Sequence, residues 1–200
     1  ALTALTTVLA ANALATPFDM KFVRVDQGQG VSLTFDCNVM SVFAGKLQFQ
    51  NQSNGNKFLS VCADLTRPIS PGQSYNVNPQ FSALSTPAVK RAGNIVAANF
   101  FGANTNFKAA ALQVAVWEAL YDGGSTPSFT GGRFCLNGAS QNLTSQATEY
   151  YQAICNTGNA LHYKTTTNCG QSQLAPVPEP AALTALVAGV GLMVARRKKS

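Results

Sequence analysis

Cysteine is the residue type with the most chemical potential in this 200-residue chain, which has five of them and a single histidine, His162. A zinc site is a poor explanation, because the chain has no C-x-x-C pair and only one imidazole. Cys62 differs from the others, because it lies inside an apolar stretch that is typical of a strand. Four cysteines can pair in three ways, so at least one of the five is predicted to stay free or to do chemistry.

Gln113 is a second unusual residue, because it interrupts an apolar segment with the sequence LQVAVW. On a helix Gln113 and Trp117 are four residues apart and lie on the same face. A buried glutamine needs a partner. The Gln113 side chain is either hydrogen-bonded to the backbone or covalently bonded at its carbonyl carbon.

Cys62 also has two less specific interpretations. The first is a buried disulfide or an inert thiol in a non-reactive structural or binding protein. The second is a Cys–His hydrolase, in which Cys62 would have to meet His162 across the fold. One histidine in an otherwise unrelated part of the chain is thin support for the second.

The segment around Cys62 and the LQVAVW segment together resemble bacterial thioester domains, the TQXA-type modules of surface adhesins. The shared features are a cysteine after a hydrophobic residue and the pattern hydrophobic-Gln-x-x-hydrophobic-Trp, over about residues 55–125. Val61 and Ala63 depart from the usual residues beside the cysteine. The resemblance implies an internal thioester between Cys62 Sγ and the Gln113 side-chain carbonyl, formed with loss of ammonia.

The chemistry of such a bond suggests roles for the neighbouring residues and for the protein. Trp117 would shield the bond from water, and Asp64 or Glu118 would handle protons. An amine or hydroxyl on a surface or matrix molecule would capture the acyl group, so the protein would be a single-use covalent cross-linker and not an enzyme with turnover. No cofactor or metal is implied. Four cysteines would remain as disulfide candidates, namely Cys37, Cys135, Cys155 and Cys169.

The elements that must position these residues change character along the chain. Alternation of apolar and polar residues predicts strands at 22–25, 31–35, 39–49 and 58–65. Residues 27–30 separate the first two strands, a polar turn at 51–56 joins the last two, and a proline-broken loop follows at 66–79. Helical spacing then predicts helices at 87–102, 107–121 and 140–154. The predicted fold is therefore α+β, with a β-rich first half of sandwich or barrel type and a helical second part packed on it.

Composition excludes several classes of protein. With 46% apolar and 11% charged residues, the bulk of the chain is not disordered. The net charge of +6 depends on a terminal basic cluster, and no stretch combines basic and aromatic residues as a nucleic-acid groove does. We therefore expect no nucleic-acid partner.

Both ends of the chain are predicted to direct its export. Residues 1–15 carry no charge and end in a small-x-small pattern, as in the cleavage region of a signal peptide. Residues 175–200 combine Pro178-Glu179-Pro180, an apolar stretch at 181–195 and the basic residues that begin with Arg196 and Arg197. The stretch is predicted to be a single short transmembrane helix with the body, residues 16–174, outside the membrane.

This three-part tail resembles the PEP-CTERM sorting signal. The resemblance implies an exosortase-type sorting protease as a partner and an inner-membrane-anchored intermediate. It also implies a final place on the cell surface or in the extracellular, biofilm matrix of a Gram-negative bacterium.

Overall fold

The computed structural model describes residues 16–154, 160–166 and 170–177, which hold seven strands and three α-helices. The strands are β1 (Phe18–Phe35), β2 (Asn38–Asn51), β3 (Lys57–Cys62), β4 (Ser74–Phe81), β5 (Phe134–Leu136), β6 (Ala160–Thr165) and β7 (Gln173–Pro176). The helices are α1 (Pro87–Asn99), α2 (Asn106–Tyr121) and α3 (Gln141–Gln152), with a short 3-10 turn η1 (Ser82–Leu84) before α1. The predicted combination of a β-rich first half and three helices is confirmed.

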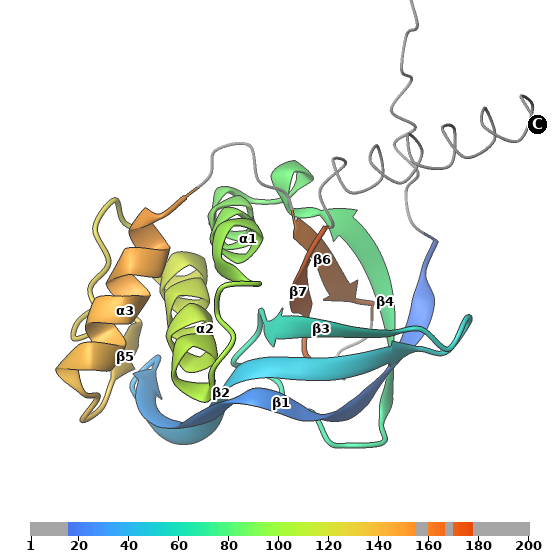
Figure 1. Cartoon of the computed structure of the whole chain (residues 1–200), viewed down its shortest axis with the longest axis horizontal. Helices are drawn as coiled ribbons and strands as arrows, with labels where there is room; N and C mark the ends of the chain where they lie inside the picture. Colours follow the sequence, from blue (N-terminus) through green and yellow to red (C-terminus); the bar gives the residue numbers. More distant parts are fainter. Residues whose placement is uncertain (1–15, 155–159, 167–169, 178–200) are drawn as a thin grey trace, which may run out of the picture.

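Six of the described strands close into an antiparallel barrel. Their order is β2-β3-β7-β6-β4-β1, and β1 pairs again with β2 to complete the circle (Figure 1). The short β5 adds to the far end of β1. The barrel interior is filled mainly by aromatic and aliphatic side chains, which include Met20, Phe22, Leu47, Phe49, Tyr75, Val77 and Tyr163. Of the two β architectures predicted, the barrel is the one that forms.

β1 is one long strand, which corrects the prediction of two separate strands on either side of residues 27–30. Its pairing with β2 shifts register between Val25 and Gly28 and then continues to Phe35. Gly28 faces Gly45 on β2, and a Cβ on either residue would lie 2.2 Å from a carbonyl oxygen of the other strand. The glycines therefore let the two backbones approach closely where the ribbon bends, instead of ending the strand.

The predicted loop at 66–79 is a loop only as far as residue 73, because β4 begins at Ser74 and contains Pro79. Pro79 pairs with Tyr163 on β6. The pairing of β4 with β1 ends at Val77, so β4 has a neighbour on one side only at this point. A proline is tolerated there because no second strand needs its missing N–H.

The three helices lie side by side against one side of the barrel (Figure 1). Side chains of Thr86, Thr105 and Ser140 cap their N-termini, as the sequence of each start favours. α2 packs against α1, α3, β1 and β2, and every residue from Ala109 to Ala119 is buried. A helix that is apolar on all sides belongs in such a central position.

Within residues 16–154, 160–166 and 170–177, no helix is both long and apolar enough to cross a membrane. The predicted tail helix, the Pro178-Glu179-Pro180 motif, Arg196 and Arg197 lie outside the described residues, and so does the predicted signal peptide. β7 includes Ala175 and Pro176, the first two residues of the segment assigned to the sorting signal.

Candidate functional site

The structure brings Cys62 and Gln113 into direct contact, although they are 51 residues apart in the sequence. The backbone N–H of Cys62 donates to Gln113 Oε1 at 2.7 Å, and Gln113 Nε2 donates to the backbone carbonyl of Cys62 at 2.8 Å. Both residues are buried. The side-chain amide of Gln113 thus answers the sequence-level question of what partners this glutamine has: it bonds both backbone groups of Cys62.

Strand pairing explains why Cys62 has those backbone groups to offer. The ladder between β2 and β3 ends at the pair Lys46–Val61, one residue before Cys62. The next N–H, that of Ala63, donates to Ser172 at the β7 side. Successive backbone N–H groups of a strand point to opposite sides. The N–H and C=O of Cys62 therefore point away from β7, to the side where β2 no longer pairs with β3. Gln113 supplies the donor and acceptor that are missing there.

The Cys62 thiol lies among donors and acceptors of the loop that follows β3. Its Sγ donates to the carbonyl of Asp64 at 3.2 Å, and the backbone N–H of Asp64 donates to Sγ at 3.3 Å. Burial raises the pKa of the thiol to about 12, although the Asp64 backbone and the Trp117 indole N–H partly oppose the rise. Within the described residues the indole N–H has no acceptor at normal hydrogen-bond geometry.

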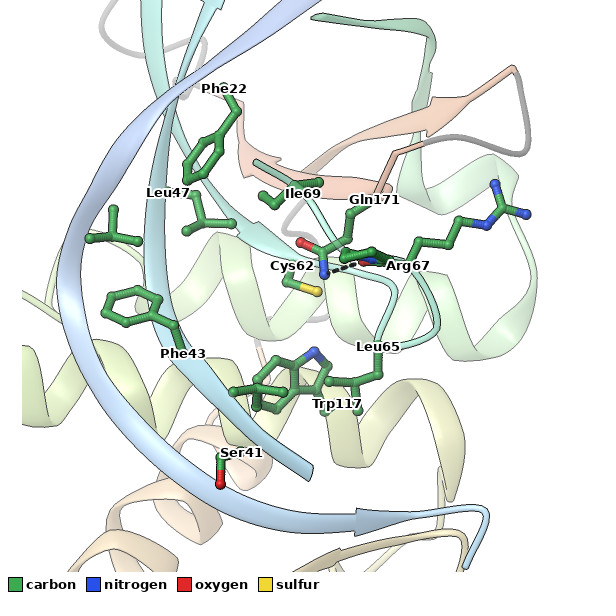
Figure 2. A pocket seen from close by; sticks show the side chains of 13 residues that line it. Phe22, Ser41, Phe43, Leu47, Cys62, Leu65, Arg67, Ile69, Trp117 and Gln171 are labelled. Carbon is green, nitrogen blue, oxygen red and sulfur yellow. Dashed lines mark hydrogen bonds between the residues drawn. The ribbon is translucent and has the colours of Figure 1, made fainter. Parts of the chain in front are cut away.

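A cavity of about 430 Å³ opens onto Cys62. Figure 2 shows the Cys62 sulfur beside the Trp117 ring, with Leu65, Arg67 and Gln171 on one side and Phe43 and Leu47 on the other. The walls come from β1, β2, the end of β3 and the loop after it, α2 and the segment before β7. The lining residues are Phe22, Val25, Ser41, Val42, Phe43, Leu47, Cys62, Leu65, Arg67, Pro68, Ile69, Trp117 and Gln171.

Trp117 lies where a shield for the Cys62–Gln113 contact would be needed, since it is 1% exposed and lines the cavity. The Asp64 carboxylate, which was predicted to handle protons, lies in the loop that follows β3. Its carboxylate accepts from Thr66 and faces Arg67 at 3.5 Å, and it is not part of the cavity wall. Asp64 reaches the sulfur through its backbone. Glu118 also points elsewhere, because its Oε1 accepts from the Ser128 N–H.

The Cys–His interpretation fails on strand register. Cys62 pairs with Gln173, which pairs with Tyr163, and Tyr163 is part of the barrel interior. His162 pairs with Leu174, so these two side chains share one face of the sheet. Neighbouring residues of a strand point to opposite faces, so His162 and Cys62 lie on opposite sides of the barrel wall. Burial lowers the pKa of His162 to about 4, so it is neutral.

The cysteines outside this contact are only partly described. Cys37, Cys62 and Cys135 are free thiols. Cys37 is exposed in the β1–β2 turn, and Cys135 Sγ points to the carbonyl of Gly132. The predicted disulfides therefore do not include Cys37 or Cys135 in this structure, nor does the alternative of a disulfide at Cys62 hold. Cys155 and Cys169 lie outside the described residues. The described part of the chain has no cluster of three potential metal-ligating side chains.

Sequence reasoning missed the residues that hold the loop over the cavity. The Leu65 N–H donates to the Tyr121 hydroxyl at 2.7 Å. Gln171 Nε2 donates to the Arg67 carbonyl at 3.1 Å, which is the dashed line in Figure 2. Gln173, which is buried beside Cys62, accepts from the Ser60 hydroxyl at 3.0 Å. These contacts join segments more than 50 residues apart, so no local pattern could have indicated them.

No protein-family model and no curated protein matches the chain. Among solved structures, the chain is similar to the N-terminal thioester domain of a surface protein from Clostridium perfringens, with a TM-score of 0.50 and 15% identity. The match covers 80% of this chain and 98% of that domain. At this identity the similarity shows the fold: the barrel with its attached helices is arranged as in a thioester domain.

Proposed function

We propose that this chain is an exported surface or matrix protein that stores an internal thioester between Cys62 Sγ and the Gln113 side-chain carbonyl carbon, and uses it once for covalent attachment. The observation that carries the proposal is the Gln113 amide held by both backbone groups of Cys62, at 2.7 and 2.8 Å, beside a cavity that reaches the sulfur. The thioester-domain fold and the surface-protein origin of the similar structure support it.

The chemistry of formation uses only groups already in place. Cys62 Sγ attacks the Gln113 side-chain carbonyl carbon and forms the C–S bond, while the C–N bond breaks. The thiol proton moves to the departing nitrogen, which leaves as ammonia. The Cys62 N–H already donates to Oε1, so it can stabilise the negative charge that develops on that oxygen.

In capture by a target, the Cys62 sulfur is the leaving group. An amine attacks the same carbon, the C–S bond breaks, and Gln113 becomes an amide joined to the target. The proton that the attacking amine loses goes to the departing sulfur, which must also be hydrogen-bonded as the C–S bond breaks, because burial disfavours the thiolate of Cys62. The Asp64 and Trp117 N–H groups are the donors nearest to that task. The thioester does not re-form, so one molecule makes one link.

Exclusion of water is the second requirement, because a thioester that hydrolyses is lost. Trp117 and Leu65 are buried and line the cavity next to each other, close to the Cys62 sulfur (Figure 2). Gln113 itself is fully buried. Shielding by apolar side chains favours storage of the electrophile until a nucleophile enters the cavity.

The test is the intact mass of the full chain before and after methylamine. The proposal expects a mass lower by one ammonia than the sequence requires, restored by methylamine with the label on Gln113. Cys62→Ala should remove both the deficit and the uptake, whereas the matched control Cys135→Ala should keep both. A full-mass chain that takes up no methylamine would show that Cys62 is an inert thiol in a non-reactive matrix protein.

We also propose that residues 175–200 direct the protein to the surface by way of an inner-membrane intermediate and an exosortase-type protease. The support is the order of the three sequence parts within residues 175–200. Replacing Pro178-Glu179-Pro180 by alanines should leave an uncleaved, membrane-bound precursor on immunoblots of cell fractions. Normal release of that variant would contradict the sorting role.

A further inference from the structure

Trp117 is a buried residue with a polar atom that has no partner. Its side chain is 1% exposed, and within the described residues its indole N–H has no hydrogen-bond acceptor. A buried donor without an acceptor costs free energy, because it has given up its hydrogen bond to water. A phenylalanine would contribute to an apolar wall without that cost. Shape alone therefore does not explain an indole at this position.

The unpartnered N–H lies beside the atom that must depart in the proposed reaction. Trp117 follows Gln113 by four residues on α2, so the two side chains lie on the same helix face, towards Cys62. Figure 2 shows the indole nitrogen on the edge of the ring that is turned towards the Cys62 sulfur. Burial raises the pKa of that thiol to about 12, and the indole N–H acts in the opposite direction, because it stabilises negative charge on Sγ.

The backbone N–H of Asp64 is the second donor near the sulfur, but it is already bonded. It donates to Sγ at 3.3 Å while the sulfur still carries its proton. A bond that is present before and during the reaction lowers the energy of both states and accelerates the reaction little. The Trp117 N–H gains an acceptor only when negative charge develops on Sγ. Its contribution therefore falls on the transition state.

We infer that Trp117 is a catalytic residue of the proposed thioester, whose indole N–H donates a hydrogen bond to the Cys62 sulfur as the C–S bond breaks. This inference rests on the proposed function, because it concerns the leaving group of the same bond. The bonding electron pair passes to Sγ, and the proton that the attacking amine loses ends on the sulfur. The indole keeps its own proton, because it is too weak an acid to give it up.

The role of donor and the role of shield predict opposite effects when they are lost. Loss of a shield admits water, so hydrolysis of the thioester becomes faster. Loss of a donor to the leaving group slows hydrolysis and amine capture by the same factor, because the sulfur departs in both reactions. For a donor to a developing charge we expect this factor to be about 10 to 100.

The experiment replaces the indole by an isostere that lacks the N–H. Trp117 is the single tryptophan of the chain, so a tryptophan-auxotrophic host supplied with 3-benzothienylalanine changes this position alone in the full chain. The analogue keeps the size and the apolar surface of the ring system, and a sulfur atom takes the place of the N–H. The matched control is 5-fluorotryptophan, incorporated in the same way, because it retains the N–H.

Intact mass follows the loss of the thioester in buffer alone and in methylamine. The benzothienyl chain should lose it about 10- to 100-fold more slowly than the parent chain under both conditions, and the fluorotryptophan chain should react as fast as the parent. After opening by methylamine, alkylation of Cys62 at a fixed pH should also be slower in the benzothienyl chain, because the thiolate has lost a donor. Alkylation of the exposed Cys37 should be the same in all chains.

Trp117→Phe is the second variant, for the case that the benzothienyl chain does not fold. It also lacks the N–H, so it should capture methylamine more slowly than the parent chain, although its smaller ring leaves the cavity wider.

Equal rates in the three chains, or faster hydrolysis of the benzothienyl chain, would overturn the catalytic role and leave Trp117 as the shield of an established thioester. Capture of methylamine by Trp117→Phe at the parent rate or faster would overturn it too. A parent chain of full mass that takes up no methylamine would overturn the thioester itself, and the role of Trp117 with it.

Discussion

Replacing Gln113 by leucine tests whether its side chain is a structural partner of the Cys62 backbone. Leucine is similar in size but removes the acceptor of the Cys62 N–H and the donor to the Cys62 carbonyl. Cys62 is 3% exposed, so water cannot replace either partner. A buried backbone group without a partner costs about 1–3 kcal/mol, so the two together should cost about 2–6 kcal/mol.

The comparison variant for this prediction is Cys62→Ala. Neither variant can form a thioester, so the cross-link contributes to the stability of neither variant. Cys62→Ala keeps the backbone groups that bond Gln113 and loses only a small buried side chain, which we expect to cost about 1 kcal/mol. Gln113→Leu should therefore be less stable than Cys62→Ala by about 1–5 kcal/mol.

The measurement is urea unfolding of both variants, with tryptophan fluorescence as the signal, because the single tryptophan, Trp117, lies at this site. Equal slopes against urea would show that the two variants unfold from comparably compact states. If Gln113→Leu proved as stable as Cys62→Ala, or more stable, the amide would not be capping the Cys62 backbone. The contact on which the proposed function rests would then be refuted.

Three further predictions concern groups around the site. After methylamine has opened the thioester, alkylation of the freed Cys62 thiol should be slow at pH 7, because its pKa is raised to about 12 and only the thiolate reacts. The alkylation rate should rise about tenfold per pH unit up to pH 10. Mass mapping should find the exposed Cys37 modified first, and a Cys62 alkylation rate that does not change with pH would contradict this prediction. Burial raises the pKa of Glu118 from its model-compound value of 4.5 to about 7, so the folded chain holds this proton more tightly than the unfolded chain. The contribution of Glu118 to stability is therefore largest below about pH 4.5 and is lost as the pH rises to about 7. Thermal unfolding of Glu118→Gln should lack that part of the pH dependence. Identical pH profiles of the melting temperature in the variant and the parent chain would refute the assignment. Tyr121→Phe should cost about 1–2 kcal/mol and speed hydrogen exchange at the Leu65 amide, because that N–H loses its acceptor; unchanged exchange would mean that Tyr121 does not hold the loop.

Much of the secondary structure could be predicted from local pattern. The helices at α1, α2 and α3 begin at capping threonine or serine residues and carry apolar residues at helical spacing, so both their number and their bounds within a few residues were predictable. Local pattern failed where a residue acts through its neighbours in space. Glycine is a residue type that is common in turns, yet Gly28 lies within β1 and lets its backbone approach that of β2 closely at Gly45.

The candidate site divides in the same way. Cys62 and Gln113 could be selected from the sequence, because a cysteine in an apolar strand and a glutamine in an apolar helix are chemically conspicuous. Their hydrogen bonds could not be predicted, because they depend on where the ladder between β2 and β3 ends. The position of His162 on the opposite face likewise follows from strand register and not from spacing along the chain.

The sequence by itself therefore determined the residue types, the helices and most strands, since these depend on interactions between residues a few positions apart. Tertiary structure alone decided the closure of the barrel, the contact between Cys62 and Gln113 and the apolar walls of the cavity. Those walls come from β1, β2, the end of β3 and the loop after it, α2 and the segment before β7. Segments so far apart in the chain meet only because burial of two cores and completion of backbone hydrogen bonds bring them together.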